Sequence, residues 1–140
     1  MALGIDYIGV DCNTNLKDAY NNLTKRYNTT SNISIVIDKS ENINISQLDF
    51  DFVLSSPPFW DEKEKIVEKY NNTNTDYKQF LNTSLIPVMR ECLKKKVSVC
   101  LYLPKNMYDD ISKIFGECNY QLTFNTKGRN SGIIYCWIKN

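Results

Sequence analysis

Ser55 and Ser56 stand between an apolar run and two consecutive prolines, in the stretch DFVLSSPPFW over residues 51–60. Pro57 and Pro58 restrict the backbone, so the groups around them are held with little conformational entropy left to lose. Phe59 and Trp60 follow directly. A rigid corner with polar groups on one side and aromatic rings on the other is a place where chemistry could occur. An ordinary turn that ends a strand would explain the same residues.

Two acids occupy comparable positions upstream. Asp11 ends the apolar stretch around DYIGVDC, and Asp38 directly follows the β-branched run ISIVI. In open sheets of parallel strands, ligands bind beyond the carboxyl ends of the strands. Asp11, Asp38 and the Ser55-Ser56 pair are therefore expected at the same edge of one sheet. The alternative is that each acid caps the helix or turn that follows it.

Hydrophobic periodicity indicates the elements that would position these residues. A helix over 76–96 should kink at Pro87, which cannot continue the backbone hydrogen bonding. Gly116 should end the next helix, and the residues KGRNSG should connect a closing hairpin. The expected strands are 6–12, 33–37, 50–55, 97–103, 120–124 and 133–138, and the expected helices are 16–27, 76–96 and 106–115. This order predicts an α/β fold with a mostly parallel sheet, helices on both faces and a C-terminal antiparallel hairpin.

Composition restricts the class of protein. A length of 140 residues suits a single domain spanning 1–140, and 42% hydrophobic with 24% charged residues is typical of a chain with a real core. The net charge of +1 does not require a polyanionic partner. The sequence has no apolar run of about 18 residues and no signal peptide. We therefore expect an intracellular protein that is not secreted, in cytoplasm or nucleus or within a viral particle.

The cysteines and the absence of histidine restrict the chemistry further. The sequence contains no His and no C-x-x-C, so no metal site is expected. A Ser-His or Cys-His nucleophile is excluded within these residues. Cys100 and Cys136 lie in apolar runs and are interpreted as small core residues.

The segment Ser56-Pro57-Pro58-Phe59 resembles the S/D/N-P-P-aromatic motif of the amino-group DNA methyltransferases. These enzymes methylate adenine N6 or cytosine N4 with S-adenosylmethionine. DFVLSSPPFWDEKE is similar to the phage and large-virus branch of the family. The resemblance implies that Ser56 and the Pro57 carbonyl accept hydrogen bonds from the target amino group, that Pro58 keeps the corner rigid, and that Phe59 stacks on a flipped base.

The resemblance extends over most of the chain. YIGVDCN looks like the second cofactor motif, which implies that Asp11 holds the ribose hydroxyls of S-adenosylmethionine. Asp38 matches the acid near the cofactor's adenine. The implied fold is Rossmann-like, and the runs VSVCLYL and the closing hairpin match its later strands.

The sequence departs from the family in one respect. The first strand and its Gly-rich loop, which holds the methionine part of the cofactor, have no counterpart here, and 61–75 is too short to replace a target-recognition domain. In the family that strand lies between the strands corresponding to 6–12 and 50–55. Either these two strands pair directly, or another chain supplies a strand between them. The isolated chain is not expected to bind S-adenosylmethionine, which would be used only with a partner.

Three hypotheses follow: half of a split methyltransferase, a degenerate methyltransferase fold kept as a structural subunit of a larger assembly, or a module that binds DNA or RNA. Lys94, Lys95 and Lys96 suit a helix end and alternatively a nucleic-acid patch. Lys127 and Arg129 could contact phosphate. Trp60 is interpreted as a core residue, and Phe59 as a core or a stacking residue.

Overall fold

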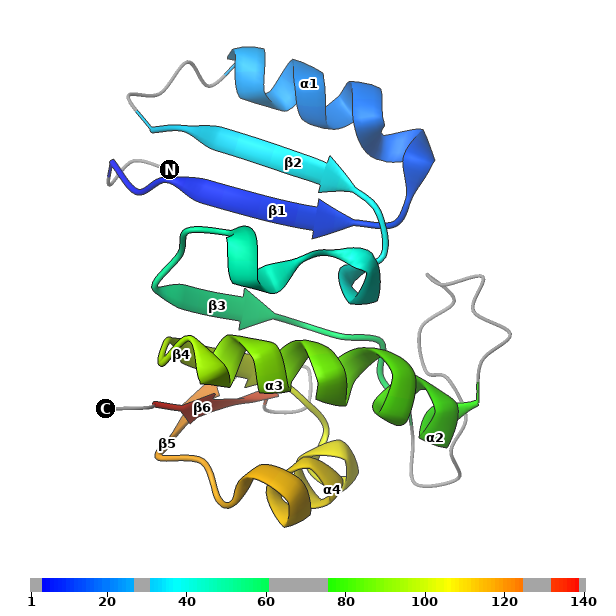
Figure 1. Cartoon of the computed structure of the whole chain (residues 1–140), viewed down its shortest axis with the longest axis vertical. Helices are drawn as coiled ribbons and strands as arrows, with labels where there is room; N and C mark the ends of the chain where they lie inside the picture. Colours follow the sequence, from blue (N-terminus) through cyan, green and yellow to red (C-terminus); the bar gives the residue numbers. More distant parts are fainter. Residues whose placement is uncertain (1–3, 27–30, 61–75, 125–131, 139–140) are drawn as a thin grey trace. The chain divides into compact units, whose positions relative to one another are not determined.

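The structure, a computed structural model, describes residues 4–26, 31–60, 76–124 and 132–138 (Figure 1). The fold is mixed α/β. The chain divides into two compact units, residues 1–43 and residues 44–140. Each unit contains its own β-sheet. The expectation of a single domain stays a prediction.

The N-terminal unit is a parallel β-α-β arrangement. β1 (Tyr7–Asp11) pairs with β2 (Ile33–Ile37), and α1 (Lys17–Arg26) connects them. The Asn13 side chain accepts a hydrogen bond from the backbone N–H of Asn15 and so caps the 3-10 turn that leads into α1. Both strands and the helix agree with the sequence prediction.

The C-terminal unit contains a four-stranded sheet in the order β3-β4-β6-β5. β3 (Phe52–Ser55) is parallel to β4 (Ser98–Tyr102). β6 (Gly132–Trp137) lies antiparallel between β4 and β5 (Tyr120–Phe124). The predicted parallel pairing and the C-terminal antiparallel hairpin are therefore both present.

The long predicted helix is present, and the effect of Pro87 is visible. α2 (Tyr77–Phe80) begins at Asp76, whose carboxylate accepts a hydrogen bond from the Gln79 N–H. A π-helical segment over Leu81–Leu85 leads into α3 (Ile86–Lys94), where Pro87 occupies the first turn. Because proline has no N–H and crowds the preceding turn, the hydrogen-bond ladder shifts register there.

The core of this unit lies on one face of its sheet. Along each strand, alternate residues point to opposite faces. Val53, Val99, Leu101, Tyr135 and Trp137 share the core face. α3 and α4 (Lys105–Phe115) pack there, and α4 ends at Gly116 with φ +82°, as predicted. The sequence predicted helices on both faces, whereas the helices of the described part of this unit that carry core residues share one face.

Cys100 and Cys136 are buried, as predicted, and they are also joined in a disulfide. They lie directly opposite each other on β4 and β6, with Cα atoms 4.1 Å apart. The sequence did not predict this pairing.

The two apolar strands for which direct pairing was considered belong to different sheets. Among the described strands, β1 pairs with β2 and β3 pairs with β4. The two strands lie in separate compact units, so direct pairing of β1 with β3, or a strand supplied between them, stays a prediction.

We predict that Lys95 and Lys94 differ sharply in their contribution to stability. The Lys95 ammonium donates to the carbonyl oxygens of Leu48 (2.7 Å) and Ser46 (3.1 Å) and lies over the Phe50 ring. Lys95→Met should lower the free energy of unfolding by about 1–2 kcal/mol, because hydrogen bonds from a charged donor are lost.

Lys94 is the matched control, because it forms only an exposed ion pair with Glu91. Lys94→Met should change the free energy by less than about 0.5 kcal/mol. Urea unfolding followed by circular dichroism measures both. Equal losses in free energy of unfolding for the two variants would contradict the stabilising role given to the Lys95 hydrogen bonds.

Candidate functional site

The corner formed by residues 55–60 lies at the carboxyl end of β3, beside the carboxyl end of its parallel neighbour β4. Ser55 pairs in register with Leu101. β4 ends at Tyr102, and the chain then reaches Pro104, which precedes α4. The Asn106 side chain of α4 donates a hydrogen bond to the Trp60 carbonyl oxygen at 3.1 Å. The corner is thereby connected both to the sheet and to the start of α4.

Trp60 anchors the corner in the core. Only 2% of Trp60 is exposed. Its ring stacks on Phe80 with centroids 4.7 Å apart and packs against Tyr77 at 5.8 Å. Pro57 is also buried. The interpretation of Trp60 as a core residue is confirmed, so Trp60 is not available to stack on a ligand.

Phe59 has a different environment. It is half-buried, and its ring makes an edge contact with Tyr102, at 5.0 Å and an interplanar angle of 76°. Tyr102 in turn contacts Phe124 on β5 at 5.4 Å. Phe59, Tyr102 and Phe124, named here the aromatic row, thus run from the corner onto the sheet.

Gly132 lies against this row, and a side chain there would meet two of its rings. A Cβ atom at position 132 would lie 2.3 Å from Phe124 Cζ and 2.8 Å from Tyr102 Cε2. Distances this short do not occur between real atoms, so any other residue would displace one of the rings.

Ser55 and Ser56 are both exposed. A hydroxyl group can accept as well as donate hydrogen bonds. The corner therefore combines an accessible polar group, a backbone restricted by two prolines and a partly exposed aromatic ring. Such a combination suits a planar ligand that carries a hydrogen-bond donor at its edge.

Asp11 is the last residue of β1, and both of its carboxylate oxygens already accept hydrogen bonds. One accepts from the Asn13 N–H at 2.8 Å and the other from the Tyr20 hydroxyl at 2.5 Å. The carboxylate beside it raises the pKa of Tyr20, chiefly through that hydrogen bond. A carboxylate offers about four acceptor positions, so hydroxyl groups of a ligand could still bind.

Asp38 directly follows β2, and its carboxylate accepts hydrogen bonds from the Asn42 side chain and from the Lys39 N–H. The Asn42 contact and then the Lys39 contact hold the pKa of Asp38 below its usual value. Asp11 and Asp38 thus both have the turn-capping contacts that were the alternative interpretation. They lie in the N-terminal unit, whereas the corner lies in the C-terminal unit.

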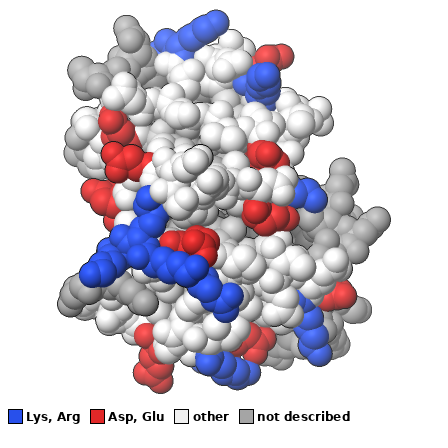
Figure 2. All heavy atoms as spheres, viewed as in Figure 1, with Lys and Arg blue, Asp and Glu red and all other residues white. Residues whose placement is uncertain are grey.

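The basic residues near the end of α3 are largely engaged within the protein. Lys94 pairs with Glu91, and Lys95 holds the loop carbonyls described above. Figure 2 shows acidic side chains beside the basic ones on this face of the molecule. Lys127, Arg129 and the segment 61–75 lie outside the described residues.

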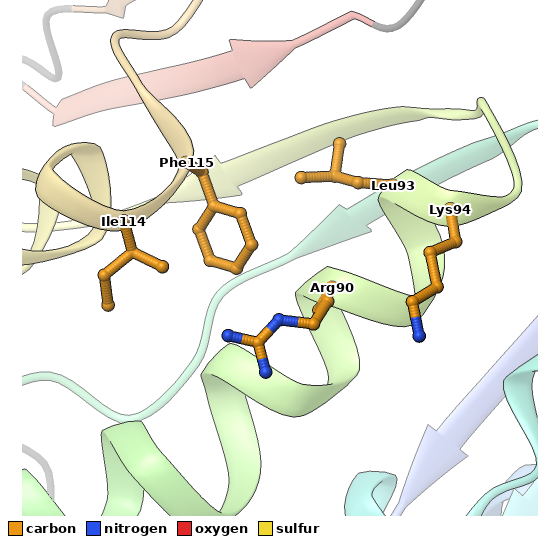
Figure 3. A pocket seen from close by; sticks show the side chains of 5 residues that line it. All are labelled: Arg90, Leu93, Lys94, Ile114 and Phe115. Carbon is orange, nitrogen blue, oxygen red and sulfur yellow. The ribbon is translucent and has the colours of Figure 1, made fainter.

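A shallow pocket separates α3 from α4 (Figure 3). Its apolar floor comes from Leu93 and Phe115, with Ile114 beside them, and Arg90 and Lys94 stand on the α3 side. It lacks the rigid corner and the hydroxyl group found after β3. We therefore take the corner as the candidate site.

Two further findings apply to the described part of the chain. No group of three or more His, Cys, Asp or Glu side chains there could hold a metal ion. None of the helices there is long and apolar enough to cross a membrane.

Comparison with known proteins gave no match: neither a family model, nor a curated protein, nor a solved structure is similar to this chain.

Sequence reasoning located the corner but missed three contacts: Tyr20 with Asp11, Asn106 with Trp60, and Tyr102 with Phe59. Tyr20 lies nine residues after Asp11, among the apolar residues at helical spacing in the predicted helix 16–27, which was an available signal. The other two depend on strand register, which the sequence does not display.

We predict that alanine substitutions of Trp60 and Phe59 lower the free energy of unfolding by different amounts. Trp60→Ala should lower the free energy of unfolding by about 3–5 kcal/mol, since it leaves a large cavity in the core. Phe59→Ala should cost only about 1–2 kcal/mol, because the ring is half-buried. Chemical denaturation measures both, and a larger loss for Phe59 than for Trp60 would refute this description of the corner.

Proposed function

We propose that the chain is one half of a split S-adenosylmethionine-dependent nucleic-acid methyltransferase, the half that binds the amino group to be methylated. Its Rossmann-like fold would be completed by a second chain. The single observation that carries the proposal is the corner after β3. There, an exposed Ser56, two prolines and a half-buried Phe59 occupy the carboxyl end of a strand in a parallel pair.

The chemistry requires little from the chain beyond positioning. The exocyclic nitrogen of adenine N6 or cytosine N4 is a weak nucleophile, because its lone pair is delocalised into the ring. The Ser56 hydroxyl oxygen and the Pro57 carbonyl oxygen would each accept a hydrogen bond from one N–H of the amino group. This would turn the nitrogen lone pair toward the methyl donor. Phe59 would stack on the extruded base, in a contact worth roughly 1–3 kcal/mol.

The N-terminal unit would contribute to binding of the methyl donor. S-adenosylmethionine, when bound, supplies the methyl group from its sulfonium. Asp11 has lone pairs left for ribose hydroxyls, and Asp38 would lie near the adenine. The carboxylate of Asp38, like any Asp at neutral pH, is ionised and can accept from a donor group.

No residues of this sequence correspond to a Gly-rich loop for the methionine part of S-adenosylmethionine, because no G-x-G occurs. The proposal therefore includes a second chain that brings such a loop. The position of β3 at the edge of the described four-stranded sheet supports the proposal, since an edge strand presents N–H and C=O groups to an incoming strand.

A non-catalytic role is the second candidate. In it, the same edge strand serves only for assembly into a larger complex, and the corner is a relic. The capping contacts of Asp11 and Asp38 favour this alternative, because they explain both acids without a ligand.

We predict that the purified chain alone does not bind S-adenosylmethionine with useful affinity. The methionine end of the cofactor has no loop to hold it, so the dissociation constant should be no tighter than roughly 1 mM, about −4 kcal/mol. Isothermal titration calorimetry tests this. A micromolar dissociation constant would show that these 140 residues hold the cofactor unaided and would remove the need for a second chain.

We predict that methyl transfer depends on the corner in a residue-specific way. The tagged chain is purified from its own source with its bound proteins and assayed with tritiated S-adenosylmethionine and single-stranded DNA. Ser56→Ala should lower turnover at least about tenfold, a loss of 1.4 kcal/mol or more in transition-state stabilisation. Ser56→Asn should retain activity, since it restores an acceptor. Phe59→Leu should lose activity whereas Phe59→Tyr keeps it, because only the latter preserves the stacking face.

Two outcomes would contradict the proposal. Absence of methylation by the wild-type complex would leave the assembly role as the better candidate. Equal turnover in all four variants would place the chemistry away from the corner.

A further inference from the structure

The second face of the four-stranded sheet is apolar and exposed. Alternation along the strands places Phe52 and Leu54 of β3 on this face, opposite the core. The hairpin register adds residues of β5 to the same face. We name this surface the open face, and its exposed members are Phe52 (53%), Leu54 (63%), Tyr120 (63%), Leu122 (59%) and Phe124 (39%).

The open face carries no charge among the described strands. The remaining side chains that alternation assigns to it are polar but neutral, small or apolar: Ser98, Cys100, Tyr102, Ile134 and Cys136. The described strands therefore offer no counter-charge on this face to a charged ligand or nucleic acid. An identical face meets no like-charge repulsion, so the surface is compatible with a second copy of itself.

The distribution of exposed side chains over the open face favours the same occupant. The outer strands β3 and β5 present its exposed large side chains, whereas the middle strands β4 and β6 present Ser98, the buried disulfide of Cys100 and Cys136, and the partly buried Tyr102 and Ile134. When two sheets pack face to face, side chains of the inner faces interdigitate. The exposed outer residues of one copy would pack over the less exposed central strands of the other, related by a two-fold axis.

The exposed area is sufficient for a weak dimer. Aromatic side chains each offer about 150–250 Å², so five large apolar side chains roughly half exposed provide on the order of 500 Å² per chain. Two copies together would bury about 1,000 Å², which is the lower limit for a specific interface. A patch of this size is also at the upper end of what a monomer usually exposes.

We propose that two copies of this chain associate through the open face, as a two-fold sandwich of their four-stranded sheets. This inference goes beyond the proposed function and does not depend on it. It concerns a face of the sheet rather than the edge at which a second protein would add a strand, and it requires neither cofactor nor nucleic acid.

Sedimentation equilibrium of the purified chain, over roughly 1–500 µM, tests this proposal. A monomer–dimer equilibrium is expected, with a dissociation constant on the order of 10–100 µM. Leu54→Lys and Leu122→Lys should each raise it at least about tenfold, because a buried charge would lie in the interface. Both residues are exposed in the single chain, so the folded monomer should tolerate the changes, which circular dichroism can verify.

Ile114→Lys is the matched control, since Ile114 is an equally apolar and exposed residue (49%) on α4, which covers the opposite face. It should leave the dissociation constant unchanged. Leu122→Ser serves as the second variant if a lysine disturbs the fold, and it should weaken the dimer in the same direction. A chain that stays monomeric throughout the range, or a dimer unaffected at both Leu54 and Leu122, would overturn the proposal.

Discussion

The burial of Trp60 between Phe80 and Tyr77 is the contact on which the corner depends. Trp60 directly follows Phe59, so fixing its ring in the core also fixes the direction in which the chain leaves β3. The hydrogen bond from Asn106 to the Trp60 carbonyl then sets the corner relative to α4. Pro57 and Pro58 remove the remaining backbone freedom. Phe59 consequently stays half-exposed while its neighbour is buried.

The C-terminal unit distributes its apolar residues unevenly between the two faces of the sheet. One face is closed by α3 and α4, and its side chains form a continuous core. The opposite face retains exposed Phe, Tyr and Leu residues, and β3 lies at one edge of the sheet formed by the described strands. A parallel strand pair is normally covered on both faces. The helices of the described part of this unit cover only one of them.

Much of this fold was predictable from hydrophobic periodicity. Runs such as ISIVI and the stripe along 76–96 gave the strands and the long helix within a few residues, and Gly116 marked the end of α4. The place of the corner after a strand was predictable from the apolar run that leads to Ser55 and Ser56, directly before two prolines. The disulfide, the division into two sheets and the one-sided core were not predictable, because each depends on which strands pair and in what register. The sequence places Lys95 at a helix end or in a nucleic-acid patch, whereas the structure shows it donating hydrogen bonds to two loop carbonyls.

The tight fit of Gly132 has a consequence for how variation at the corner could arise. Position 132 lies on the closing hairpin, far along the chain from Phe59, yet the two are linked through Phe124 and Tyr102. A methyl group at Gly132 would press on both rings, and Tyr102 would transmit that displacement to the edge of Phe59. The orientation of the ring at the corner is thus set in part from the opposite end of the aromatic row. A related sequence with another residue at position 132 would therefore orient the Phe59 ring differently, with every residue of the corner unchanged.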